Sequence, residues 1–251
     1  MSLGPIIAFL ALDDAALPST EQVLQVLSQH WPEMPAVAEP QQRPGVMTFA
    51  LDDDLVGIAL IPKPLPWKDM AGPCEAAWYW PQAADAFQDH AAHLIATILA
   101  GSRDRLQSAV RLTAMVAAAA AASNARGIYW GPGRLVNSPE DFFRESQQIG
   151  RTNLPLNLWL DFRIVPGSDA THSLFTTGMA AFGHRELEIW DSGKPPQFLR
   201  DCAYNIAHYV LEKGIALKQN ETIGLSDDER IPISVEPSRW DSSMMIARLE
   251  L

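Results

Sequence analysis

The sequence predicts an α+β fold in two lobes, each with an antiparallel or mixed sheet and covering helices. Short apolar runs of strand length are interspersed with amphipathic helical segments, but they do not alternate strictly as in a doubly wound sheet. Strands followed by a covering helix occur once in each half of the chain. We therefore expect an N-terminal lobe over residues 1–130, a connecting segment with a short helix over 131–155, and a C-terminal lobe over 156–251.

The N-terminal lobe begins with the pattern β-α-β-β. Residues 6–12 form an apolar run of strand length, and Ser19 with Gln22 three positions later predicts a capped helix. Residues 46–51 and 55–61 predict a β-hairpin. This order is typical of a split β-α-β, ferredoxin-like lobe.

In the rest of this lobe the sequence pattern predicts a short helix over 82–90, a strand over 93–99, a long helix over 104–123 and a strand over 128–130. The long helix contains an alanine block, which we interpret as a surface that packs closely against a sheet. Its expected solvent-facing side chains are Arg105, Gln107 and Arg111.

The C-terminal half opens with a predicted helix over 139–149, because Ser138 and Pro139 are suited to a helix start. An amphipathic pattern predicts a second helix over 197–213. Alternating or apolar segments predict the remaining strands, which are 157–165, 173–181, 186–190, 231–235 and 244–249.

The composition argues against two classes of partner. Acidic residues outnumber basic ones 30 to 19, and no Lys/Arg cluster is present to follow a phosphate backbone. We therefore expect no nucleic-acid partner and no binding to anionic membranes. The longest charge-free helical run, 112–124, is too short to span a bilayer, and residues 1–4 lack the basic region of a signal peptide. These observations predict a soluble, cytoplasmic protein.

The two cysteines, Cys74 and Cys202, lie far apart and form no metal-binding motif. We expect two buried free thiols and no cofactor. The common catalytic fingerprints, including the nucleophile elbow, the phosphate loop and the zincin motif, are also absent.

His90 and His93 are the one local pair with metal-like spacing. On a continuous helix they would share a face and could hold Zn²⁺ with a third ligand. The pattern instead places a helix-to-strand junction between them, which leaves their relative direction open. We favour a structural, hydrogen-bonded role for His93 and predict no metal.

His184, Arg185, Glu186 and Glu188 form a second group. Two carboxylates two positions apart on a strand project to one face and could serve as an acid–base pair or bind a cation. The alternative, which we favour, is a half-exposed strand with its charges in water and Leu187 and Ile189 inside.

Tryptophan is abundant, with eight residues. Several lie near the ends of predicted elements, where an indole can be half exposed and serve a protein interface. Core packing explains them equally well. The candidate binding residues are Trp78, Trp80, His90, His93 and Trp130.

The block that runs from Gly178 through Phe182-Gly183 to Glu186-Leu187-Glu188 is followed by a helix and a polar turn. In this arrangement the sequence resembles DUF4261, a bacterial family of unknown function, most clearly over 157–251. The resemblance is thinner over 1–130, where it rests on Trp80-Pro81 and on the run from His90 to His93. The resemblance implies a family without implying an activity. Residues 219–222 depart from the Gly-Asp turn expected there, so a function that the family places in this turn is not expected in this chain.

Two functions from different classes remain. The first is a non-catalytic accessory or immunity-like factor that binds another protein, with a homodimer as a further possibility. The second is a metal-dependent or acid–base hydrolase built from His90, His93, His184, Glu186 and Glu188. The second requires these groups to meet within one cleft.

Overall fold

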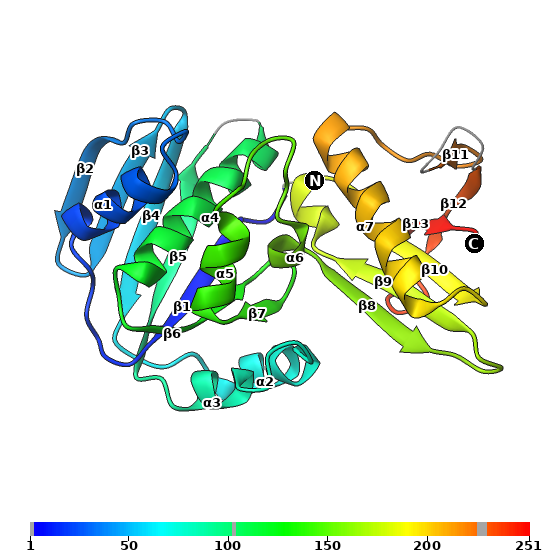
Figure 1. Ribbon diagram of the computed structural model, residues 1–251, viewed down its shortest axis with the longest axis horizontal. Helices are drawn as coiled ribbons and strands as arrows, with labels where there is room; N and C mark the ends of the chain where they lie inside the picture. Colours follow the sequence, from blue (N-terminus) through cyan, green and yellow to red (C-terminus); the bar gives the residue numbers. More distant parts are fainter. Residues whose placement is uncertain (1–2, 102–103, 225–229) are drawn as a thin grey trace. The chain divides into compact units, whose positions relative to one another are not determined.

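The computed structural model describes residues 3–101, 104–224 and 230–251 and divides into two compact units. The first unit is Gly4–Leu158, and the second is Trp159–Leu251 together with Leu3. Each unit contains one sheet, of seven and six strands respectively, and helices that pack on it (Figure 1). The predicted α+β class is confirmed.

The N-terminal sheet is antiparallel throughout. Its central strand β1 (Ile7–Leu12) lies between β5 (Ala92–Ala100) and β6 (Ala125–Trp130). Because both neighbours are antiparallel to β1, they are parallel to each other, and α4 (Arg105–Ala121) connects them as a split β-α-β unit. The wider ferredoxin-like likeness stays a prediction. The other strands are β2 (Ala38–Arg43), β3 (Val46–Leu51), β4 (Asp54–Ile61) and β7 (Leu135–Asn137).

Three helices lie over one face of this sheet: α1 (Thr20–His30), α4 and α5 (Pro139–Ser146) (Figure 1). The predicted capping box at Ser19 is confirmed, because its hydroxyl accepts from the Gln22 amide and the Gln22 side chain accepts from the Ser19 amide. The alanines of α4 are buried except for Ala121 at its end, as expected for close packing. Within segment 131–155, β7 pairs with β6 and α5 packs on α4.

The expectation that Arg111 faces water is wrong. Arg111 is buried and donates to Asp54 (2.6 Å) and to Asp52 (2.5 Å), at the turn of the β3–β4 hairpin. Asp54 also accepts from the Ser108 hydroxyl at 2.7 Å. Carboxylates 57 and 59 positions away in the chain give Arg111 partners inside the unit that helical periodicity cannot predict.

Two short helices, α2 (Trp67–Ala76) and α3 (Ala83–Gln88), cover part of the N-terminal unit next to β6 and β7. The sequence did not predict α2, because three prolines precede it and Pro73 lies inside it. Their buried side chains form one cluster with Ala11 and Val136, against which Phe9 and Tyr129 pack.

The C-terminal sheet is mixed, because β10 (Leu187–Ser192) pairs with β13 (Met245–Leu249) in parallel and the other pairs are antiparallel. Helix α7 (Pro196–Lys213) packs on β8, β9 and β10 through the apolar stripe that the sequence predicted (Figure 1). The remaining strands are β8 (Asp161–Pro166), β9 (His172–Thr177), β11 (Thr222–Ile223) and β12 (Ile231–Pro237).

Two predicted strands are shorter than expected. The first residues of 157–165 belong to a one-turn helix, α6 (Leu156–Trp159), and β8 begins only at Asp161. Strand β9 ends at Thr177 because Gly178 adopts a φ of 122°, which starts the 3₁₀ helix η1 (Met179–Phe182).

Candidate functional site

His90 and His93 lie in the N-terminal unit and are both buried. The His90 Nε2 accepts from the Leu65 amide at 2.6 Å, and its Nδ1 lies 2.8 Å from the Phe87 carbonyl oxygen. The His93 Nδ1 lies 2.7 Å from the Lys63 carbonyl oxygen. Burial lowers the pKa of both imidazoles, and the hydrogen bonds to carbonyls oppose this only in part.

This geometry gives both histidines a structural role, because each is buried and hydrogen-bonded to the backbone of the unit. With both of its ring nitrogens engaged, His90 has no lone pair left for a metal ion. Across the described part of the chain, no three His, Cys, Asp or Glu side chains are grouped so as to hold a metal ion.

Glu186 directly precedes β10 in the chain, and its side chain is buried against the first residues of η1. Its two carboxylate oxygens together accept four hydrogen bonds of 3.2 Å or less. The donors are the Thr176 hydroxyl and the amides of Gly178, Met179 and Ala180. Amides at the start of a helical turn carry partial positive charge and stabilise an anion there. Glu186 therefore holds the turn between β9 and β10.

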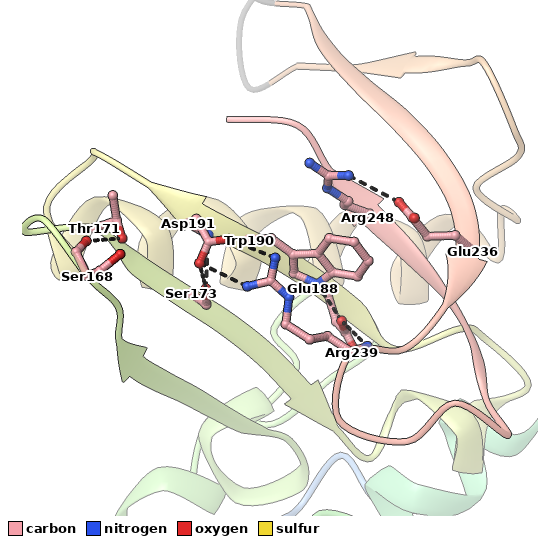
Figure 2. A network of polar contacts seen from close by, with 9 residues as sticks. All are labelled: Ser168, Thr171, Ser173, Glu188, Trp190, Asp191, Glu236, Arg239 and Arg248. Atoms are coloured by element: carbon pink, nitrogen blue, oxygen red, sulfur yellow. Dashed lines mark hydrogen bonds and ion pairs between the residues drawn. The ribbon is translucent and has the colours of Figure 1, made fainter.

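Glu188 is 2% exposed, on the face of the C-terminal sheet opposite Leu187 and Ile189. Its carboxylate accepts from the Trp190 indole nitrogen at 2.6 Å and from the Arg239 amide at 3.3 Å (Figure 2). It also accepts from the Ser238 hydroxyl. The expectation that these strand carboxylates lie in water is wrong, because each has its own set of donors. Leu187 and Ile189 are buried as predicted.

The indole of Trp190 is the centre of a polar network on this face (Figure 2). The guanidinium carbons of Arg239 and Arg248 lie 4.7 Å and 4.5 Å from its ring centroid. Arg239 donates two hydrogen bonds to Asp191, at 2.9 and 2.7 Å, and Arg248 donates one to Glu236 at 3.3 Å. This Trp190 network attaches the β12–β13 loop to β10, with Trp240 stacking on Phe175 at 4.6 Å.

The backbone of Asp191 has a φ of 48°, which lies in the left-handed region. Its carboxylate also accepts from the Ser173 hydroxyl at 3.3 Å. The pKa of Asp191 is lowered, chiefly by its hydrogen bonds from Arg239. Arg239, Arg248 and Asp191 each have an ion-pair partner within the network, although the Arg248 Nε is buried without a hydrogen-bond partner among the described residues.

The candidate residues do not form one acid–base centre. His184 and Glu186 line the same pocket of the C-terminal unit, whereas Glu188 belongs to the Trp190 network. His184 is partly buried and hydrogen-bonded to the Ile215 backbone, and burial lowers its pKa. His90 and His93 belong to the other unit.

The candidate tryptophans differ sharply in exposure. Trp130 is fully buried, which assigns it to the core. Trp80 is 9% exposed and packs in the core cluster, but it also lines the cleft next to Trp78. Trp78 is 82% exposed, and Tyr79 beside it is half-exposed and anchored by its hydroxyl, which donates to the Val136 carbonyl at 2.9 Å. Trp67 on α2 is also exposed.

Trp67 and Trp78 flank a cleft of about 550 Å³ on α2 and α3, which we call the aromatic cleft. Its wall also includes Glu75 and Pro81, and Cys74 lies at its base. Burial raises the pKa of the Cys74 thiol to about 11, so this thiol is not a poised nucleophile. Cys74 and Cys202 are both buried and unbridged, as predicted.

The charged side chains around the aromatic cleft are mostly acidic. Along α2, α3 and the residues that join and follow them, the exposed acids outnumber the exposed base Lys68; they are Asp69, Glu75, Asp85 and Asp89. The cleft itself combines exposed indoles with one carboxylate in its wall, Glu75, and exposed aromatic side chains are enriched at protein interfaces.

Several residues of these sites escaped sequence reasoning. Tyr79 was not among the candidates, although it adjoins Trp78, and Trp67 was one of the tryptophans near element ends but was not chosen as a binding residue. Arg239, Arg248 and Asp191 had no local signal, because the network joins positions about 50 apart in the chain.

The fold and the sites define a two-unit α+β protein with an exposed aromatic cleft and a paired polar network. Residues 175–245 match the family model of a domain of unknown function, DUF4261, which confirms the resemblance in the C-terminal third. The matched region contains Glu186, Glu188 and most of the Trp190 network. No curated protein and no solved structure matches this chain. Within the described residues, every helix is too short or too polar to cross a membrane.

Proposed function

We propose that this protein is a non-catalytic binding protein, a cytoplasmic accessory or immunity-like factor, that holds a basic segment of another protein in its aromatic cleft. The observation that carries the proposal is Trp78, whose indole is 82% exposed beside Trp67. An exposed indole gains a large apolar contact area on binding, which is why tryptophan dominates many interfaces.

The charge around the cleft defines the partner. Glu75 lies in the cleft wall, and an arginine or lysine of a partner can pair with it while stacking on an indole. Two copies of this acidic surface would repel each other, so the proposal favours a different protein over a homodimer at this cleft.

The alternative, a hydrolase that uses His90, His93, His184, Glu186 and Glu188, has less support. Glu186 and Glu188 are each surrounded by donors from the protein, and the imidazole of His90 is engaged on both nitrogens. A general base needs an accessible lone pair that points towards a substrate.

The test is capture of a partner by the immobilised full chain, with matched variants. We expect one retained protein whose binding falls at least about tenfold with Trp78→Ala or Glu75→Lys, the loss of one hot-spot contact. Higher salt should release it, because exposed charges are screened. Tyr209→Ala, which removes an exposed aromatic residue from α7, is the control and should bind normally.

The captured protein is then purified and titrated against the same four chains. The proposal fails if the partner binds Trp78→Ala as tightly as the natural sequence, or if no protein is retained at low salt. Equal loss with Tyr209→Ala would point to unfolding and not to the cleft.

A further inference from the structure

A second recess of about 620 Å³ lies wholly within the C-terminal unit. Its walls are mainly apolar and come from the end of α7, the segment after it, and β13; they include Val210, Leu217, Met244, Met245 and Ile246. Leu3 adds a further apolar side chain at Gly183. This size and lining are those of small-molecule pockets, which are largely apolar with a few polar groups that fix orientation.

Arg185 supplies such a polar group. Its Nη1 makes one long hydrogen bond, 3.4 Å to the Leu217 carbonyl, and no carboxylate of the described residues lies within ion-pair distance of it. Acids outnumber bases in this chain, and the other arginines of this unit that line the Trp190 network have carboxylate partners. Arg185 therefore presents several unused N–H donors beside an apolar recess.

The other polar groups of the recess leave the positive charge of Arg185 uncompensated. His184 is neutral at neutral pH, because burial lowers its pKa below the usual value. The Glu186 carboxylate also lines the recess, but its oxygens face the Thr176 hydroxyl and three amides of the η1 turn. Its charge is stabilised there and forms no ion pair with Arg185.

We propose that this recess binds a small amphipathic carboxylate, with the apolar body against Val210, Leu217 and Ile246 and the carboxylate on the Arg185 guanidinium. Guanidinium and carboxylate match in geometry and can form two parallel hydrogen bonds. The site is independent of the aromatic cleft, which lies in the other unit, so either proposal can fail without the other.

Titration calorimetry on the full chain tests the site with three probes. Decanoate carries both the apolar body and the charge, decanol carries the body alone, and acetate carries the charge alone. We expect decanoate to bind with a stoichiometry of one, at least tenfold more tightly than decanol, and acetate to give no measurable binding.

Substitutions locate the binding. Arg185→Ala should weaken decanoate by about 10- to 100-fold, the range for a lost hydrogen bond to a charged group, and leave decanol within about twofold. Ala216→Phe fills the recess from an exposed position and should abolish both. The control is Arg163→Ala, because Arg163 belongs to the same unit, is partly exposed and pairs with Asp161 outside the recess.

Three results would overturn the proposal. Equal affinity for decanoate and decanol, unchanged in Arg185→Ala, would mean that no headgroup is recognised. Binding that survives Ala216→Phe would place the probe elsewhere. Absence of binding by all three probes to a chain whose circular dichroism is native would mean that the recess holds no such ligand.

Discussion

The two units bury a carboxylate in different ways. In the N-terminal unit Asp54 is opposed by a cation, Arg111, and by the Ser108 hydroxyl. In the C-terminal unit Glu188 is held by neutral donors, the Trp190 indole, the Ser238 hydroxyl and the Arg239 amide, and no ion pair of the described residues includes it. Both arrangements offset desolvation, but only in the first does the loss of a single side chain take a cation away from the buried carboxylate.

The largest expected effect is therefore in the N-terminal unit. Arg111→Met should lower the free energy of unfolding by about 3–5 kcal/mol, because it removes the Arg111 guanidinium that pairs with the buried Asp54 carboxylate. Combining Arg111→Met with Asp54→Leu should recover much of the loss, since the buried charge is then gone. Urea unfolding followed by circular dichroism measures both.

The control for this experiment is Arg163→Met, which breaks a partly exposed ion pair with Asp161. Such pairs contribute about 0–1 kcal/mol. If Arg111→Met unfolds at the same urea concentration as this control, the buried pair does not carry the difference between the units.

A smaller effect is expected at the two glutamates of the C-terminal unit. Glu186→Ala and Glu188→Ala should each cost about 2–3 kcal/mol, because each leaves buried donors without an acceptor. The two losses should add within about 0.5 kcal/mol in the double variant, since the carboxylates have separate partners. A coupling well above 1 kcal/mol would instead indicate one shared site and revive the acid–base interpretation.

The histidines should make stability depend on pH in both units. His90, His93 and His184 have pKa values lowered from 6.5, so the unfolded chain binds more protons than the folded one just below this pH. Their contribution to stability is present above pH 6.5 and is lost as the pH falls below it. An NMR titration of the imidazole signals should give three pKa values below 6.5, and a value at or above 6.5 would contradict the assigned burial for that residue.

The smallest effect is expected at the exposed edge of the Trp190 network. Asp191→Asn removes the charge opposite Arg239 but keeps a side chain that tolerates the left-handed φ of 48°. We expect an unfolding midpoint close to that of the natural sequence, because both charges are largely exposed. A large drop would show that the loop depends on this ion pair more than on the buried contacts of Glu188.

Much of the architecture could be predicted because its causes are local. The capping box at Ser19, the β3–β4 hairpin and the buried stripe of α7 each depend on residues within a few positions or turns of one another. The failures also have local causes. Helix α2 is hidden by prolines, and Gly178 ends β9 four residues early because its positive φ starts a 3₁₀ turn.

The candidate sites were less predictable, because burial and hydrogen-bond partners come from distant segments. The aromatic content correctly drew attention to Trp78, but the same pattern included Trp80 and Trp130, which are buried. The presence of a tryptophan in a sequence does not indicate whether its side chain is buried in the core or exposed.

The sequence by itself determined the α+β class, most helices and strands, the free cysteines and the likeness to DUF4261. These features could be inferred because they depend on composition and on patterns within short segments of the chain. Only the tertiary structure decided that Arg111 is buried, that Glu186 and Glu188 serve separate networks, and that Arg185 adjoins an apolar recess. Whether a charged side chain meets water, a cation or a set of amides depends on segments that the fold brings together from far along the chain, and that environment decides its role.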